Sequence, residues 1–87
     1  MTVAEYNEPL ASGIIGILKD RGIKQTYLAE KIGLTDQELS DSLNGRRIIK
    51  AREIPQIAFA LDLTPNDLYE MGSRAVRNSD RENASNE

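Results

Sequence analysis

Cysteine, histidine and tryptophan are absent from this sequence, and three tyrosines and one phenylalanine are its only aromatic residues. Without thiols and imidazoles the chain has no disulfide, no thiolate nucleophile, no histidine base and none of the usual zinc ligands. A protein without cysteine suits a reducing compartment, so we expect a cytoplasmic location. We also expect no metal ion and no other cofactor.

Long apolar runs are missing too. No stretch approaches the roughly 20 apolar residues that span a bilayer, and the N-terminus lacks a basic segment followed by an apolar core. We therefore expect a soluble protein that does not associate with membranes. Its 87 residues, 39% of them hydrophobic, allow one small domain with a modest core.

Charge is spread unevenly along the chain. It has 11 Lys and Arg against 14 Asp and Glu, a formal net charge of −3. This average argues against DNA binding, because DNA-binding proteins neutralise phosphates with basic residues. Four basic residues nevertheless gather in one short stretch: Arg46, Arg47, Lys50 and Arg52. We expect this stretch to form a loop that could run beside a phosphate backbone.

Apolar residues recur at helical spacing in five short segments. The expected helices are residues 8–20, 25–32, 36–44, 53–61 and 65–72. Asn7 is the expected N-cap of the first helix, and Gly72 is expected to end the last. We therefore predict an all-α fold, a compact bundle of five short helices. Residues 8–72 form the domain, residues 1–7 a loose leader, and the polar residues 73–87 a disordered tail.

The segment from residue 25 to residue 45 contains two short amphipathic helices joined by a glycine corner. Gly33 suits the left-handed conformation that ends the first helix and turns the chain. Thr35 and Glu38 have the spacing of a capping box at the start of the second helix, and Asn44 and Gly45 mark its end. A helix pair of this shape, with a polar outer face on its second helix, can enter a DNA major groove.

This pattern resembles the Cro/C1 (XRE-type) helix-turn-helix domain of phage and bacterial repressors, from about Ile14 to Leu68. The positions that carry the resemblance are Gln25, Ala29, Gly33, Leu39 and the ending Leu43, Asn44, Gly45, Arg46 and Arg47. The resemblance implies a bundle of the lambda-repressor-like DNA-binding type. It also implies a sequence-specific transcriptional regulator, a repressor, that binds double-stranded DNA as a homodimer and inserts residues 36–44 into the major groove.

Two departures from the family pattern are informative. Where the family commonly pairs an arginine with a glutamate, this chain has Leu18 and Leu43. Replacing both partners leaves no stranded charge, and apolar packing can be as stable as a buried ion pair. We therefore expect Leu18 and Leu43 to touch. Ser42 stands where the family is usually apolar, so its hydroxyl needs a partner if it is buried.

The resemblance and the chemistry of the side chains together assign site residues. The candidates for reading bases are Gln37, Asp36, Ser40 and Asp41, because a glutamine can pair with adenine and a carboxylate can accept from cytosine N4. The candidates for binding phosphates are Gln25, Asn44, Arg46, Arg47 and Lys50. Each has an ordinary alternative: an exposed polar residue on any helix, an acidic residue that favours a helix N-terminus, or a basic residue that solvates a loop.

A second functional class stays open. The same scaffold could serve as a protein-interaction module, antitoxin-like or antirepressor, and the acidic outer face of the second helix favours that reading. An enzyme is the least favoured class, since the carboxylates are scattered on capping positions and a small helical bundle has little room for a pocket. For the same reason we expect no small-molecule ligand.

Overall fold

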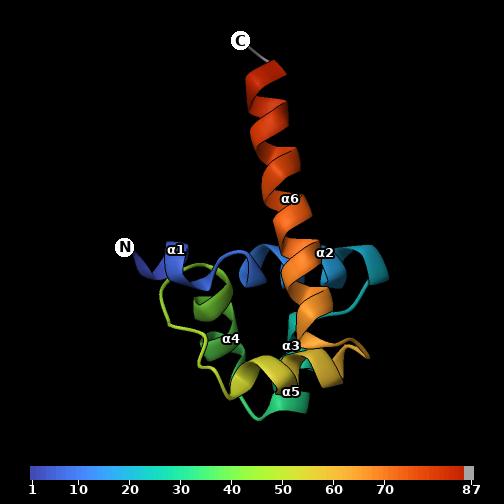
Figure 1. Cartoon of the computed structure of the whole chain (residues 1–87). Helices are drawn as coiled ribbons and strands as arrows, with labels where there is room; N and C mark the ends of the chain where they lie inside the picture. The colour runs from blue at the N-terminus through green and yellow to red at the C-terminus, as the bar shows by residue number, and fades with distance from the viewer. Residues whose placement is uncertain (86–87) are drawn as a thin grey trace.

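Helices without strands build residues 1–85, the part of the chain that the computed structural model describes; side chains are described as far as Ala75. The helices are α1 (Val3–Asn7), α2 (Leu10–Arg21), α3 (Gln25–Ile32), α4 (Asp36–Leu43), α5 (Glu53–Ala60) and α6 (Pro65–Ser85). Helices α2 to α5 form a compact bundle, and α6 crosses α2 (Figure 1). The predicted all-α bundle is confirmed, with one helix more than the five expected.

Short-range sequence signals set most helix boundaries. Gly22 and Gly33 both have the left-handed conformation, with φ of 65° and 76°, and each ends its helix where expected. Thr35 caps α4 in a complete capping box. Thr64 and Asp67 repeat this arrangement at the start of α6, as each receives a hydrogen bond from the other's backbone N–H.

One cluster of buried apolar side chains joins the helices. Leu18 on α2 and Leu43 on α4 are 5% and 6% exposed and belong to this cluster. The predicted apolar replacement of the family's ion pair is therefore buried in the core. The other members are Leu10, Ala11, Ile14, Ile17, Leu28, Ala29, Leu39, Ile49, Ile57, Ala58, Leu61 and Leu68.

The N-terminus departs from the prediction. Residues 3–7, expected as part of a loose leader, form α1, which Thr2 caps by accepting a hydrogen bond from Glu5 N–H. Asn7 does not cap the next helix, whose N-cap position is occupied by Pro9. Asn7 is instead only 1% exposed, because its side-chain amide bonds to backbone groups near the end of α4.

The end of the domain also departs from the prediction. Gly72 was expected to end the last helix, yet α6 continues to Ser85. Gly72 and Gly13 lie where α6 crosses α2: a Cβ on Gly72 would be 1.7 Å from the Pro9 carbonyl oxygen, and one on Gly13 would be 2.7 Å from that of Leu68. Gly72 therefore serves close helix packing instead of helix termination. Of the predicted tail, residues 86 and 87 lie outside the described residues.

Within the described residues, none of the helices has the length and apolar character needed to cross a membrane.

Candidate nucleic-acid interface

The start of α4 is fixed by reciprocal hydrogen bonds. Thr35 N–H donates to Glu38 Oε1 at 2.9 Å, and Glu38 N–H donates to Thr35 Oγ1 at 3.1 Å. Hydrogen bonding from Thr35, first of all from its backbone N–H, stabilises the charged Glu38 carboxylate and lowers its pKa below the ordinary value. Together with the turn at Gly33, the reciprocal bonds fix the direction in which α4 leaves α3.

The end of α4 is fixed as well. Arg46 N–H donates to the Asp41 carbonyl at 2.8 Å across Gly45, whose φ is 78°, the pattern of a Schellman cap. A Cβ on Gly45 would lie 2.6 Å from the Cβ of Ala4. Gly45 is therefore required both for the left-handed turn and for the close contact with α1. Together these two constraints fix the direction in which the loop leaves α4.

The predicted base-reading side chains lie on the outer side of α4 and contact the polar residues one turn away. Gln37 Nε2 donates to Asp41 Oδ1 at 2.9 Å, and Asn44 Nδ2 donates to the Ser40 carbonyl at 2.8 Å. Asp36 and Gln37 are exposed, whereas Ser40 and Asp41 are half-buried. The polar face expected for a recognition helix is thus present, and four of its residues are linked in pairs, Gln37 with Asp41 and Ser40 with Asn44.

The structure separates the two arginines that follow α4. Arg46 has a side chain that is 69% exposed, and its guanidinium lies 3.6 Å from the Asp41 carboxylate. Arg47 has a side chain that is 20% exposed and makes an ion pair with Glu53, with Nη2 2.7 Å from Oε2 and Nη1 3.0 Å from Oε1. Arg46 is therefore available to a ligand, whereas the guanidinium of Arg47 is held within the chain.

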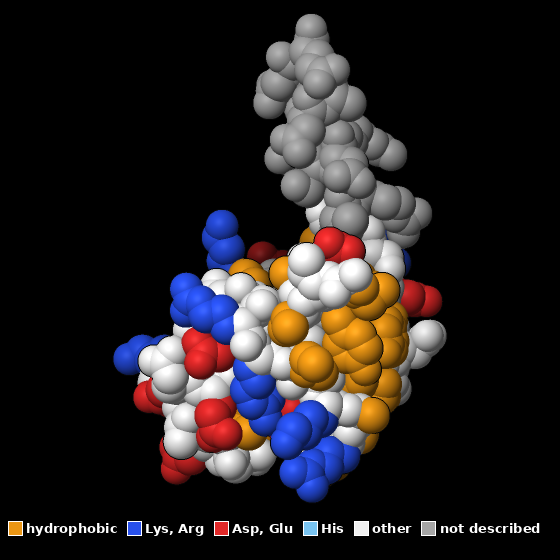
Figure 2. All heavy atoms as spheres, turned by 90° about the vertical axis from the view of Figure 1, so that its left-hand side faces the viewer, with side chains coloured by type: hydrophobic (Ala, Val, Ile, Leu, Met, Phe, Trp, Pro, Cys, Tyr) orange, Lys and Arg blue, Asp and Glu red, His pale blue; other side chains and the backbone are white. Residues whose placement is uncertain are grey.

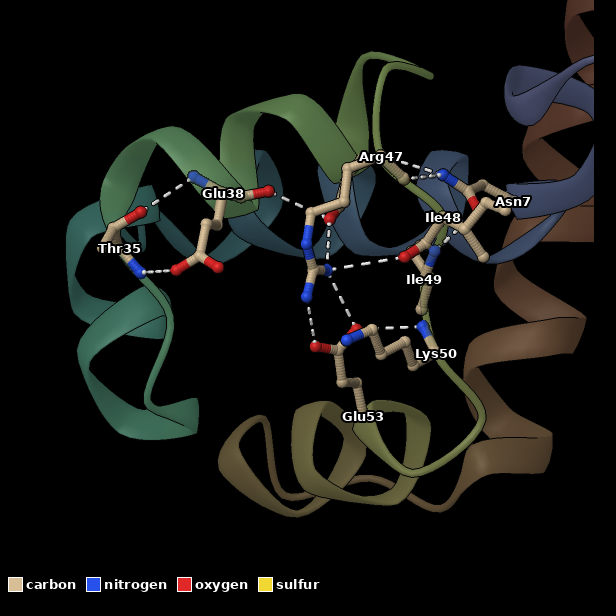
Figure 3. Close-up of polar contacts among 9 residues, drawn as sticks. Asn7, Thr35, Glu38, Arg47, Ile48, Ile49, Lys50 and Glu53 are labelled. Carbon is tan, nitrogen blue, oxygen red and sulfur yellow. Dashed lines mark hydrogen bonds and ion pairs between the residues drawn. The ribbon is translucent and has the colours of Figure 1, made fainter.

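A polar network surrounds that ion pair (Figure 3). The Ser42 hydroxyl is buried and has the partners that burial requires: it donates to the Glu38 carbonyl and accepts from Arg47 Nη1, both at 2.9 Å. Lys50 N–H donates to Glu53 Oε1 at 2.9 Å. The hydrogen bonds from Arg47 hold the pKa of Glu53 below its ordinary value, and the same contact raises the pKa of Arg47.

Asn7 links α1 to the same region. Its Nδ2 donates to the carbonyls of Ser42 and Arg47 at 2.9 and 2.8 Å, and its Oδ1 accepts from Ile49 N–H at 2.9 Å. Neither Asn7 nor Glu53 was predicted from the sequence to lie beside the end of α4 and the loop. An asparagine far along the chain from its partners leaves no local pattern, and the glutamate three residues after Lys50 resembles any helix-start acid.

The remaining phosphate candidates lie at the two ends of the motif. Gln25 is the first residue of α3 and is exposed, and Lys50 is exposed at the end of the loop after α4. On the face that includes α1, α4 and this loop, basic and acidic side chains are interspersed, with a hydrophobic area along one edge (Figure 2). The local charge is therefore mixed, in keeping with the acidic total.

A second surface, not predicted from the sequence, lies beside α3 and α5. Phe59 is 87% exposed and Tyr27 is 50% exposed, and both line an open groove of about 570 Å³. The groove also has basic side chains in its wall, Arg21 and Lys24. Lys31 Nζ lies 5.4 Å from the centre of the Tyr27 ring.

Among the described residues, no cluster of acidic side chains could hold a metal ion.

A family model described as the Cro/C1-type HTH DNA-binding domain matches residues 14–72. That range contains α3, α4, the following loop and α5, and it begins after α1. No curated protein and no solved structure matches the chain significantly.

Proposed function

The chain belongs to the Cro/C1-type helix-turn-helix DNA-binding family, a family of DNA-binding regulators, and on this basis we propose that it is a sequence-specific transcriptional repressor. In this proposal α4 enters the major groove of double-stranded DNA and its outer face reads the bases. The protein acts as a homodimer on DNA.

The observation that carries the proposal is the geometry of α4. Both of its ends are fixed, by the Thr35 capping box and by the Schellman cap at Gly45, and its outer face is polar along its whole length. A rigid helix with polar side chains at successive turns suits the readout of base edges. An exposed Arg46 directly after the helix suits a phosphate beside the groove.

We assign the contacts as follows. Gln37 is the principal base reader, since its amide can donate to and accept from adenine. Asp36, Ser40 and Asp41 are further base-reading positions. The phosphate contacts come from Gln25, Asn44, Arg46 and Lys50. Arg47 contributes chiefly by holding the loop that carries Arg46 and Lys50, because its guanidinium is bound to Glu53.

We infer the homodimer from the small number of base pairs that one recognition helix can contact. A single recognition helix contacts only a few base pairs, so useful specificity needs two copies about one helical turn apart. We place the contact between copies at α6, where Tyr69 and Met71 are 42% and 36% exposed. Sedimentation of the free protein at increasing concentration tests the contact. A strict monomer that also occupies its best DNA site as a single copy contradicts the dimer.

A selection experiment tests DNA recognition. The protein is incubated with a pool of random DNA duplexes, the bound fraction is sequenced over several rounds, and the affinity of the enriched site is compared with that of random DNA at two salt concentrations. We expect one enriched motif and an affinity for random DNA that falls steeply with salt. Recovery of no motif, with no salt-dependent binding, refutes the proposal.

A second candidate function rests on the groove at Tyr27 and Phe59. Phe59, which is 87% exposed, shares the groove with the half-exposed ring of Tyr27, and Arg21 and Lys24 outnumber Asp62 among its charged lining residues. An acidic peptide with an apolar anchor, part of a partner protein, would complement both features. The protein would then act as an interaction module. Amide shifts around Phe59 on titration with an acidic leucine-containing peptide, absent with its lysine-substituted counterpart, would favour this function.

A further inference from the structure

We propose that Asn7 is a positioning residue for DNA binding, one that holds the loop after α4 in the shape that presents Arg46 and Lys50 to phosphates. The proposal rests on the proposed DNA-binding function for its consequence. Its structural part, the clamp on the loop, rests on hydrogen bonds alone.

The hydrogen bonds of Asn7 all go to main-chain groups. Its Nδ2 uses both hydrogens, on the carbonyls of Ser42 and Arg47, and its Oδ1 receives the N–H of Ile49. The side chain is 1% exposed, so water cannot replace these partners. One amide therefore satisfies backbone groups in the last turn of α4 and at two points of the loop, a stretch without regular secondary structure after Gly45.

Two of the three positions that Asn7 holds lie between Arg46 and Lys50, whose side chains are exposed. Arg46 precedes the clamped carbonyl of Arg47, and Lys50 follows the clamped amide of Ile49. Fixing the backbone between Arg46 and Lys50 fixes the positions of their Cα atoms, from which both side chains extend. A loop that is already ordered loses less conformational freedom when it meets a phosphate backbone, so the same contacts give tighter binding.

The clamp comes from outside the matched domain. Asn7 is the last residue of α1, and the family match begins at residue 14. Thr2 caps the start of α1. Ala4 packs against Gly45, where no Cβ would fit, and this contact anchors α1 beside the Asn7 hydrogen bonds. The segment before the matched domain is thus built onto the end of α4. It holds the loop together with the Arg47–Glu53 ion pair, which ties the loop to α5.

Two substitutions test the clamp directly. Asn7→Ala removes all three bonds, and Asn7→Asp keeps the shape and the acceptor but turns a carboxylate toward two carbonyls. Hydrogen exchange of the Ile49 amide is measured below the melting transition, beside that of Leu28 as a core amide. We expect Ile49 to exchange at least tenfold faster in both variants, with Leu28 changed far less. Equal acceleration at both amides, or none at Ile49, overturns the clamp.

A double-mutant cycle tests its consequence for DNA. Asn7→Ala is combined with Arg46→Ala and Lys50→Ala, and binding is measured at a temperature where circular dichroism shows every variant folded. Alone, Asn7→Ala should weaken binding about tenfold, the effect of ordering one or two side chains. In the Arg46→Ala/Lys50→Ala background it should have almost no effect, because the cations that it positions are gone. The same tenfold loss in that background overturns the positioning role.

Ile57→Val is the matched control, because it lowers stability at a buried site of α5 away from the loop. It should leave DNA affinity unchanged at the same temperature; a similar loss would assign the effect of Asn7 to stability and overturn the proposal. Failure of the proposed function looks different. If the unaltered protein binds no DNA but Ile49 exchange still accelerates in the variants, the clamp stands and its role in DNA binding falls.

Discussion

Arg47, in the loop after α4, and Glu53, at the start of α5, hold each other through two hydrogen bonds of 2.7 and 3.0 Å. The side chain of Glu53 is 7% exposed, so the pair is largely removed from water. The family's usual ion-pair positions are Leu18 and Leu43 in this chain, and both belong to the apolar core. The Arg47–Glu53 ion pair thus ties the loop to α5, whereas α2 and α4 meet through apolar side chains.

Removing the charge of Glu53 should destabilise the fold. Glu53→Gln keeps the shape of the side chain but leaves the partly buried Arg47 without its counterion, and we expect a loss of about 1 to 3 kcal/mol in the free energy of unfolding. Urea unfolding followed by circular dichroism measures this loss. Glu70→Gln, an exposed acid on α6, serves as the control for removing one negative charge. A Glu53→Gln variant as stable as this control would contradict the pair's structural role.

Stability should also fall in acid. The pKa of Glu53 is lowered in the folded protein, chiefly by Arg47, so its ionised form binds its partners only in the folded state. The resulting stabilisation is present above the ordinary glutamate range, near 4.5, and is lost as the pH falls through the lower folded value. Glu38 and Asp67 have pKa values lowered by their capping bonds and act in the same direction. Melting temperatures from pH 7 to pH 2 should therefore decrease below about pH 4.5, and less steeply in Glu53→Gln.

Local chemistry explains which features the sequence predicted. Capping boxes and left-handed glycines act within a few residues, so α3 and α4 were predicted to within one residue. The register of Ser42 left open whether its hydroxyl was buried with a partner, and the structure shows that it is. The family match confirmed the helix-turn-helix assignment.

Long-range partners explain what the sequence did not predict. Asn7 bonds to groups 35 to 42 positions away, and its polarity suggested a cap. In the sequence Gly72 looks like a helix terminator. Its role in close packing becomes visible only when Gly13, on another helix, lies against it. In the same way, nothing near Arg47 in the sequence distinguishes it from Arg46. Only the folded position of Glu53 separates them.

The crossing of α2 and α6 should tolerate no side chain at Gly72. A Cβ there would lie 1.7 Å from the Pro9 carbonyl oxygen, so Gly72→Ala must push the two helices apart and should cost about 3 kcal/mol or more. Gly16→Ala is the matched control on α2, since nothing lies within 4 Å of its Cβ position. That variant should gain up to about 1 kcal/mol, because alanine favours a helix. Thermal unfolding compares the two, and equal stability would refute the close crossing.

A charge at position 18 should disrupt the core. Leu18 is 5% exposed within the apolar cluster, and Leu43 can offer no counterion. We expect Leu18→Arg to cost about 3 to 5 kcal/mol by burying an unpaired charge. Adding Leu43→Glu should restore part of this loss, and denaturant unfolding of the single and double variants measures the coupling. If the double variant lost the sum of the two single effects, the residues would not face each other.

The acidic face of α4 should limit DNA affinity through Asp41. Its carboxylate accepts from Gln37 at 2.9 Å and lies 3.6 Å from the Arg46 guanidinium, so it occupies a proposed base reader and partly neutralises a proposed phosphate contact. Asp41→Asn should then strengthen binding to all DNA sequences about two- to fivefold, with a salt slope up to 1 unit steeper. Arg46→Ala should do the reverse on every sequence. Titrations of the preferred site and of random DNA at several salt concentrations separate this effect from base readout. If Asp41 instead accepts from cytosine N4, Asp41→Asn will lose about 1 to 3 kcal/mol on the preferred site alone.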